Sequence, residues 1–239
     1  MTNMTLATGF LLPIFWGLSI LGLLDNPTPA SAPLPTPTAS SVWVWKELAK
    51  GEPSPPSLPV LELALNGYAQ LQDKLKKPLL TVIDYSLPST QKRLWIIDLA
   101  QQKILLHTVV AHGRNSGALL AEKFSNRPES YQSSLGFFKT GEAYQGKHGY
   151  SLRLDGLESG INDQARARAI VIHGADYAKE TVAATAGRLG RSLGCPAVPP
   201  DLSTPLIKLI KEGTLLFIYG KDSNYLRISK FLSKALPAQ

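Results

Sequence analysis

The chain has 239 residues, of which 44% are hydrophobic and 18% are charged, and its formal net charge is +7. Its only cysteine, Cys195, excludes a disulfide bond within the chain and any site built from two cysteines. The basic charge fits an anionic envelope polymer, lipid headgroups or simple solvation, whereas no basic run or nucleic-acid motif indicates a nucleic-acid partner.

The N-terminal region has the character of an export segment. Residues 7–24 contain no charged side chain, and a helix of that length would extend roughly 27 Å, close to the roughly 30 Å of a bilayer core. We therefore interpret residues 1–24 as a signal peptide or an N-terminal membrane anchor. Small residues at 30–32 favour cleavage and Pro33 opposes it, so both interpretations stay open. In either case we expect the protein to be exported to the cell envelope, in the periplasm or on the outer face of the cytoplasmic membrane.

The next region is rich in proline, which favours an extended, semi-rigid spacer. We predict a linker over residues 25–59. Two tryptophans within it, Trp43 and Trp45, are expected either to pack on the domain that follows or to lie at a membrane surface. From residue 60 to residue 239 the composition is globular, and about 180 residues can bury one sizeable core. A single domain is therefore expected over 60–239.

Hydrophobic periodicity in this domain predicts more strands than helices. The expected elements are a helix over 58–77, a strand over 79–87, a hairpin over 93–113, a buried strand over 169–174, a helix over 203–213 and a buried strand over 214–220. Asn66-Gly67 is expected to weaken the first helix, and Thr204 is expected to cap the second. Long loops are expected over 114–168 and 175–200, and loops of that length are usually functional or mobile.

One histidine and the lone thiol form a candidate catalytic pair. His173 ends the predicted strand 169–174, and Cys195 follows it after 195 − 173 = 22 positions. A thiol is a better nucleophile as a thiolate, and a nearby imidazole can take its proton near neutral pH. Gly194 lets the backbone bend beside the thiol and leaves room for amides to point at a developing oxyanion. An inert buried cysteine and a structural histidine are the alternatives.

The segments "VIHGA" (171–175) and "GRSLGCPAV" (190–198) resemble the active-site segment of murein L,D-transpeptidases of the YkuD type, which share a His-Gly followed later by Ser-x-Gly-Cys. Several further motifs between residues 79 and 219 are similar to those of the murein L,D-transpeptidase catalytic domain family and occur in the same order. The resemblance implies a mainly β fold with few helices, a mixed sandwich or barrel-like catalytic domain, and no cofactor.

The resemblance also implies roles for individual residues. Cys195 would be the nucleophile and His173 the general base, oriented by a backbone carbonyl. Ser192 and Gly194 would shape the catalytic loop, with the amides of Gly194 and Cys195 as candidate oxyanion donors. The candidate substrate-binding residues are Gly174 of the His-Gly motif, His148 in a glycine-flanked loop, Ser134 in the "SSLGFF" turn that would support the site, Arg188 and Arg191.

The sequence departs from the YkuD-type pattern after the cysteine. Most of those enzymes carry an arginine two positions later, where this chain has Ala197. Arg188 and Arg191 precede the cysteine instead, and we hypothesise that one of them binds a carboxylate of the substrate, with an ordinary solvated charge as the alternative. His107 and His112 are expected to be structural. No pair of His or Cys has ligand spacing, so no metal is implied.

The reaction that the resemblance implies is acyl transfer from the third residue of a tetrapeptide stem, through a thioester on Cys195, to an amine that completes a 3→3 cross-link. Water as acceptor would make the same site an L,D-carboxypeptidase or hydrolase, and a non-catalytic murein-binding module is a further alternative. The expected partners are peptidoglycan stem peptides, with possible membrane anchoring through the N-terminal segment and no nucleic acid.

Overall fold

The computed structural model describes residues 1–2 and 38–232. The predicted export segment, residues 7–24, lies outside the described residues. None of the helices that the structure describes is long and apolar enough to cross a membrane.

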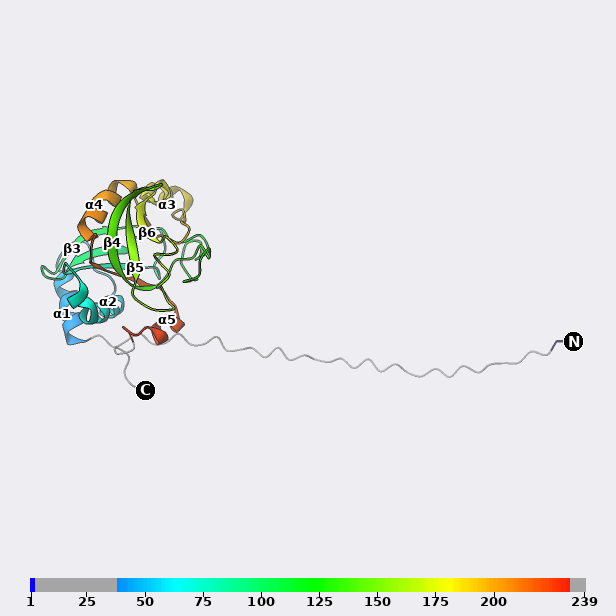
Figure 1. The fold of residues 1–239 in the computed structure, drawn as a ribbon, viewed down its shortest axis with the longest axis horizontal. Helices are drawn as coiled ribbons and strands as arrows, with labels where there is room; N and C mark the ends of the chain where they lie inside the picture. The colour runs from blue at the N-terminus through cyan, green and yellow to red at the C-terminus, as the bar shows by residue number, and fades with distance from the viewer. Residues whose placement is uncertain (3–37, 233–239) are drawn as a thin grey trace. The chain divides into compact units, whose positions relative to one another are not determined.

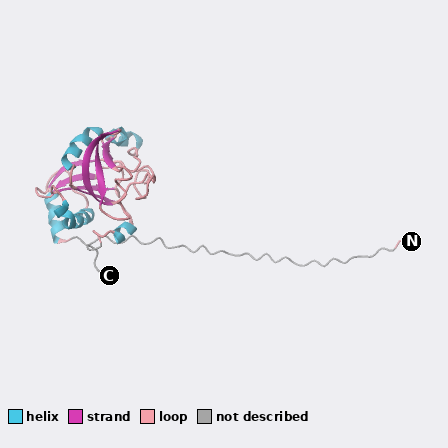
Figure 2. Cartoon of the chain, viewed as in Figure 1, coloured by secondary structure: helices cyan, strands magenta, loops and turns pink. Residues whose placement is uncertain are grey.

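A single eight-stranded sheet forms the body of the folded unit (Figures 1 and 2). The order of strands across it is β3-β2-β1-β8-β4-β5-β6-β7, in which β1–β8 and β6–β7 are parallel pairs and the others are antiparallel. Ala111, shortly after β3, forms a β-bridge with Ala197 of β7, so the two edges of the sheet meet and the sheet nearly closes. The strands are β1 Leu79–Asp84, β2 Leu94–Asp98, β3 Lys103–Thr108, β4 Gly136–Gly146, β5 Gly149–Gly156, β6 Val171–Gly174, β7 Ala197–Val198 and β8 Leu215–Tyr219.

Helices cover the two ends of this sheet. In Figure 1, α3 and α4 lie at one end and α1, α2 and α5 at the other; α4 packs against β5 and β6, and α2 packs against β1 and β8. The helices are α1 Ala39–Leu48, α2 Leu58–Leu71, α3 Glu180–Ala186, α4 Pro200–Ile210 and α5 Ser223–Ile228, with short 3₁₀ turns η1 Gln72–Lys74 and η2 Asp176–Ala178. The prediction of a mainly β fold with few helices is confirmed.

Helix α1 lies inside the region that we predicted to be linker. The Thr38 side chain accepts a hydrogen bond from the Ser41 amide and caps the first turn, and Leu48 is buried in the core. The Trp45 indole N–H donates to the Pro56 carbonyl at 2.9 Å, so this tryptophan packs on the domain. Trp43 is 53% exposed. Packing, one of the two alternatives for the tryptophan pair, therefore applies to Trp45.

Several predicted elements differ from the structure in extent, and one hairpin was missed. The predicted loop 175–200 contains helix α3 and the short strand β7. Helix α4 begins at Pro200 rather than after Thr204, because Pro200 occupies the first helical position, where its missing N–H is not needed. The predicted loop 114–168 contains β4 and β5. These strands carry five glycines, a residue depleted in strands, and the burial along β4 does not alternate regularly. The sequence pattern of an ordinary strand is therefore absent.

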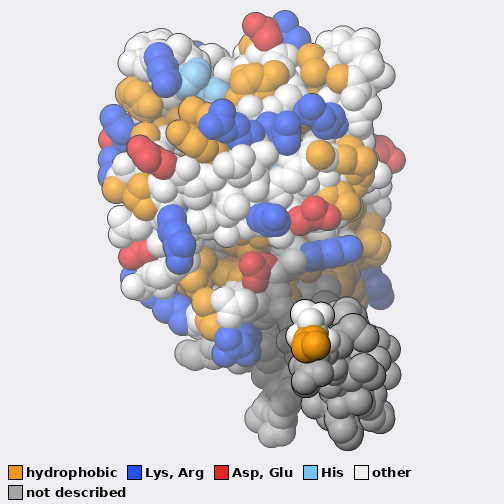
Figure 3. Space-filling model, turned by 90° about the vertical axis from the view of Figure 1, so that its right-hand side faces the viewer, with side chains coloured by type: hydrophobic (Ala, Val, Ile, Leu, Met, Phe, Trp, Pro, Cys, Tyr) orange, Lys and Arg blue, Asp and Glu red, His pale blue; other side chains and the backbone are white. Residues whose placement is uncertain are grey.

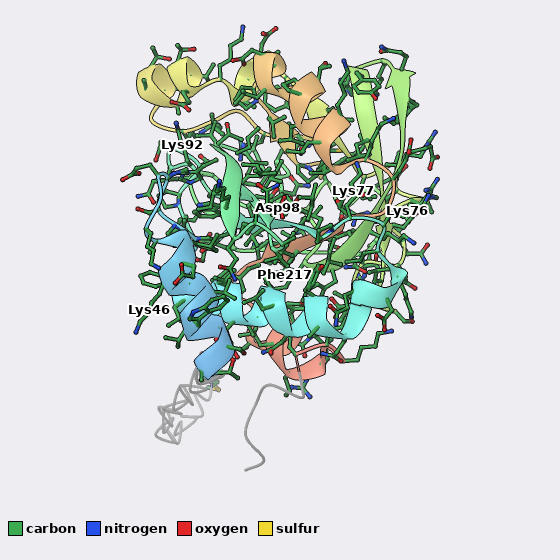
Figure 4. The ribbon with its side chains drawn as sticks, turned by 90° about the vertical axis from the view of Figure 1, so that its left-hand side faces the viewer. Lys46, Lys76, Lys77, Lys92, Asp98 and Phe217 are labelled. Atoms are coloured by element: carbon green, nitrogen blue, oxygen red, sulfur yellow. The ribbon has the colours of Figure 1, made fainter. Side chains whose placement is uncertain are left out.

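Gly67 of α2 marks a close approach between the helix and the sheet. A Cβ atom at this position would overlap the ring of Phe137 on β4. That ring is fully buried, stacks on Phe217 with centroids 4.4 Å apart, and meets Phe231 edge-on at 5.5 Å. Phe217, labelled in Figure 4, lies next to α2. Gly67 was expected to weaken the helix, but it lets α2 pack against this aromatic cluster.

We predict that Gly67→Ala destabilises the protein, although alanine favours a helix by about 1 kcal/mol over glycine. The added methyl group has to displace a confined ring, so we expect a net loss of about 1–3 kcal/mol. Thermal or urea unfolding measures the effect. The matched control is Ala69→Gly at an exposed position of the same helix, which should lose only the propensity difference. A rise in the melting temperature of Gly67→Ala would contradict the packing argument.

Candidate active site

The pairing of β6 with β7 brings the predicted catalytic pair together. His173 on β6 is opposite Ala197 on β7, and Cys195 lies immediately before β7. The Val171 amide of β6 is 3.5 Å from Cys195 Sγ, and the thiol donates to the Ala169 carbonyl at 3.6 Å. Val171 and His173, two residues apart in a strand, point to the same face. Cys195 and His173 therefore both line one cavity of about 360 Å³.

A backbone carbonyl orients the His173 ring. His173 Nδ1 is 3.0 Å from the Gly174 oxygen, and because a carbonyl oxygen only accepts, Nδ1 carries the proton. The Nε2 lone pair is then free to accept a proton. Burial lowers the pKa of His173 below its usual value, and nearby His148 adds to the effect. The ring is thus neutral near pH 7, and the expectation of a carbonyl partner is confirmed.

Gly174 is the backbone partner of the candidate base, His173. It does not line the cavity, although we had named it as a candidate substrate-binding residue. A Cβ atom at Gly174 would lie 2.7 Å from Ser203 Oγ and 3.1 Å from Pro200 Cα, at the start of α4. The glycine therefore lets α4 pack tightly against the end of β6, and its carbonyl fixes the imidazole of His173.

Burial raises the pKa of the Cys195 thiol above its usual value. The Val171 amide and the positive charges of Arg168 and Lys147 lower the pKa, but desolvation has the larger effect. The resting state of the cavity near neutral pH therefore holds a protonated thiol and a neutral imidazole. Such a pair needs the imidazole to take the proton during attack, because little thiolate exists beforehand.

Ser192 and Gly194 build the turn that presents the thiol. Ser192 Oγ accepts a hydrogen bond from the Gly194 amide at 3.0 Å and donates to the Cys195 carbonyl at 2.6 Å. Gly194 has a φ of +124°, which favours glycine, and a Cβ atom there would lie 2.9 Å from the Gln132 carbonyl. Because Ser192 occupies the Gly194 amide, the Cys195 amide is the better oxyanion donor of the two that we named.

The turn between β4 and β5 covers the base. The His148 ring stacks on the His173 ring with centroids 4.6 Å apart and planes inclined by 27°. His148, Lys147 and Tyr144 line the cavity from this hairpin. The glycine-flanked loop that we expected near the cleft is this exposed turn, and it places His148 directly at the base.

Of the two arginines that precede the cysteine, only Arg191 lines the cavity. Its Nη1 donates to the carbonyls of Arg114 and Gly117, at 3.1 and 3.0 Å. Arg188 instead donates to the Leu189 carbonyl at 3.0 Å and lies outside the lining. Ser134 is also away from it: the residue is buried and its hydroxyl donates to a backbone carbonyl at 2.8 Å. Ser134 therefore supports the site from beneath.

Sequence reasoning missed several residues of the cavity wall. Arg168 stands five positions before His173, and no spacing rule marks it. Tyr177, in the turn after β6, belongs to the "GADY" stretch of the resemblance, and Leu193 lies between Ser192 and Gly194. His107 stacks on Trp95, whereas His112 is buried beside Arg93; neither lines the cavity. Within the described residues no three His, Cys, Asp or Glu side chains are placed to hold a metal ion.

Residues 55–219, more than half of the chain, match the family model of the L,D-transpeptidase catalytic domain. The chain belongs to this family. The matched segment begins just before α2 and ends with β8, so it contains the sheet, the cavity and both members of the candidate pair.

Solved L,D-transpeptidases are similar to the chain in structure, at low sequence identity. They come from Mycobacterium smegmatis (11% identity, 60% of this chain and 59% of that chain, TM-score 0.37), Stackebrandtia nassauensis (17%, 74% and 75%, TM-score 0.36) and Xylanimonas cellulosilytica (13%, 82% and 100%, TM-score 0.35). The chain thus spans about six-tenths of the mycobacterial chain. No curated protein matches the sequence. Membership of the L,D-transpeptidase family therefore rests on the family model.

We predict that Cys195 is mostly protonated at neutral pH, so that iodoacetamide reacts only with its small thiolate fraction. Because burial raises its pKa, the alkylation rate should climb with pH and reach half its maximum above about 8.5, the usual value of a free thiol. Intact-mass spectrometry over a pH series measures this rate, with the urea-unfolded chain as the reference for an ordinary thiol. A reactive plateau that persists to pH 6 would contradict a neutral resting pair.

Proposed function

We propose that this protein is a peptidoglycan L,D-transpeptidase of the cell envelope that uses Cys195 as its nucleophile. The observation that carries the proposal is the shared cavity: the only thiol of the chain and an imidazole with a free Nε2 line it together. The family to which the chain belongs supplies the class of substrate, and the cavity supplies groups suited to acyl transfer.

In the first step Cys195 Sγ attacks the carbonyl carbon of the third residue of a tetrapeptide stem, while His173 Nε2 takes the thiol proton. A bond forms between sulfur and carbon, and the oxygen becomes an oxyanion near the Cys195 amide. The carbon–nitrogen bond to the terminal D-alanine then breaks. His173 returns its proton to the departing amine, which leaves a thioester and a neutral imidazole.

In the second step an amine from another stem attacks the thioester, and His173 accepts a proton from that amine. The carbon–sulfur bond breaks, the thiol is restored, and a 3→3 cross-link results. Water in place of the amine would release a tripeptide stem and make the protein an L,D-carboxypeptidase. The two reactions share every residue named here and differ only in the second nucleophile.

Basic side chains on both sides of the cavity suit a substrate that carries carboxylates. Lys147 lies on the hairpin side and Arg191 on the side of the catalytic loop, and neither forms an ion pair with a described Asp or Glu. Arg191 has a guanidinium fork that matches a carboxylate. We assign it to a stem-peptide carboxylate, and Arg191→Lys should raise the Michaelis constant for a carboxylate-bearing tetrapeptide.

We predict a one-to-one covalent adduct when the full chain is incubated with imipenem, the carbapenem bound in one solved L,D-transpeptidase. Intact-mass spectrometry should find the adduct on Cys195, lose it in Cys195→Ser, and find slower formation in His173→Ala, by about 10²–10⁴-fold for removal of a general base. Muropeptide products then separate cross-linking from hydrolysis. Sacculus binding without any adduct would favour a non-catalytic murein-binding module.

We also predict that acylation by imipenem persists into mild acid. The base works only when neutral, and burial lowers the pKa of His173 below its usual 6.5. The imidazole therefore gains a proton only at lower pH, and the acylation rate should fall to half its plateau at a pH below 6.5. A rate series between pH 4.5 and 8 measures this midpoint. A midpoint above 7 would contradict the assignment of His173 as a base with a lowered pKa.

A further inference from the structure

Arg168 is a partly buried cation that touches only neutral groups. Its guanidinium donates four hydrogen bonds to the segment 125–134, and no carboxylate among the described residues forms an ion pair with it. The acceptors are the Ser125 carbonyl and Ser134 Oγ, both 2.6 Å from Nη1, and Ser130 Oγ at 3.1 Å and the Gln132 carbonyl at 2.7 Å from Nη2. The positive charge therefore has no anion to balance it.

The same guanidinium lies against the catalytic loop. A Cβ atom at Gly194 would lie 3.4 Å from Arg168 Nη2, so the guanidinium lies close to the backbone of the catalytic loop at this residue. Arg168 lines the cavity together with Cys195. Its neighbour in sequence, Ala169, supplies the carbonyl that accepts the hydrogen bond of the thiol. The guanidinium charge and the hydrogen-bond acceptor of the thiol thus belong to adjacent residues.

Other arginines near this edge of the sheet are balanced. Arg153 and Arg166 form ion pairs with Glu142, and Arg166 also pairs with Asp155. Arg168, two residues after Arg166, lies in a different environment: its charge is partly desolvated, and no carboxylate among the described residues pairs with it. Cys195 lines the same cavity and would carry a negative charge there once it loses its proton.

The titratable or charged groups that face the thiol come from several elements. They are Lys147 and His148 on the hairpin turn, His173 on β6, Tyr177 in η2, Arg191 on the catalytic loop and the buried Tyr85 after β1. Among the charges that lower the pKa of Cys195, that of Arg168 is the larger and that of Lys147 the smaller. Ala197, two positions after the cysteine, is fully buried in β7 and supplies no charge.

We propose that Arg168 is a positioning residue that supplies the positive charge for the Cys195 thiolate, from a place in the sequence before the base rather than after the nucleophile. The inference rests on the proposed role of Cys195. Arg168 holds the segment 125–134, and Ser133 Oγ of that segment donates to the Gly194 carbonyl at 3.3 Å. One side chain thus fixes the floor of the catalytic loop and stabilises the charge that forms on it.

The test is the pH dependence of iodoacetamide alkylation in the full chain, which reports on the thiol whether or not peptide turnover occurs. Arg168→Gln removes the charge and should raise the pH of half-maximal alkylation by about one unit, the low end of what an adjacent opposite charge produces. Arg168→Lys keeps a charge and should stay within a few tenths of a unit of the wild type. Arg166→Gln, which removes an exposed arginine paired to carboxylates, should not move the midpoint.

A second pair of substitutions separates charge from geometry. Ser130→Ala with Ser134→Ala removes two of the four hydrogen bonds but keeps the guanidinium, and should leave the midpoint unchanged. An unchanged midpoint in a folded Arg168→Gln variant would overturn the proposal. If Arg168→Gln does not fold, the other two variants decide. An equal rise of the midpoint in Arg168→Lys and in the double serine variant would overturn the proposal, because lost hydrogen bonds and not lost charge would then explain the shift. Absence of an imipenem adduct in the wild type, with the Arg168 shift intact, would overturn only the proposed transpeptidase function.

Discussion

The site depends on one short pairing, the parallel contact between β6 and β7. Strand β7 has two residues, Ala197 and Val198, and it lies between β6 on one side and Ala111 on the other. Ala111 and Ala197 exchange two hydrogen bonds, of 2.8 and 3.3 Å. On the other side the amides of His173 and Ala175 donate to the carbonyls of Pro196 and Val198, at 3.4 and 3.0 Å. These bonds both close the sheet and set the register that places Cys195 and His173 on one cavity. The same contact therefore determines the closure of the sheet and the geometry of the candidate site.

A second buried arginine supports the other wall of the cavity. Arg93 is fully buried, and its Nη2 lies 2.8 Å from His112 Nδ1. Because a guanidinium only donates, His112 carries its own proton on Nε2, which faces the Gly117 carbonyl at 3.3 Å. Burial, with the charge of Arg93, lowers the pKa of His112 to about 4. The Gly117 carbonyl also accepts from Arg191, so a neutral histidine connects the core to the arginine at the rim.

The sequence was sufficient for the elements whose signal is local. The apolar runs around β6 and β8 predicted both strands to within two residues. The His-Gly and Ser-x-Gly-Cys motifs singled out the candidate base and the candidate nucleophile, which line one cavity. Non-local features were not visible. Gly67 reads as a helix breaker until the ring of Phe137 is placed against it. Arg168 resembles any solvated arginine in "RARA" (166–169) until four acceptors from segment 125–134 surround it. The hairpin of β4 and β5 was missed because its strands contain five glycines, a residue that is rare in strands.

The stacked rings of His148 and His173 come from different segments of the chain. The base belongs to a four-residue strand within the sheet, whereas its cover is a two-residue turn, Lys147 and His148, between Gly146 and Gly149. Gly149 has a φ of +74° and open space around it. The turn therefore ends at a left-handed backbone conformation that residues other than glycine rarely adopt. Figure 3 shows basic side chains interspersed with hydrophobic ones on one face of the molecule. The candidate base and the side chain that covers it thus come from different segments, so the turn can change in sequence without altering the strand that holds His173.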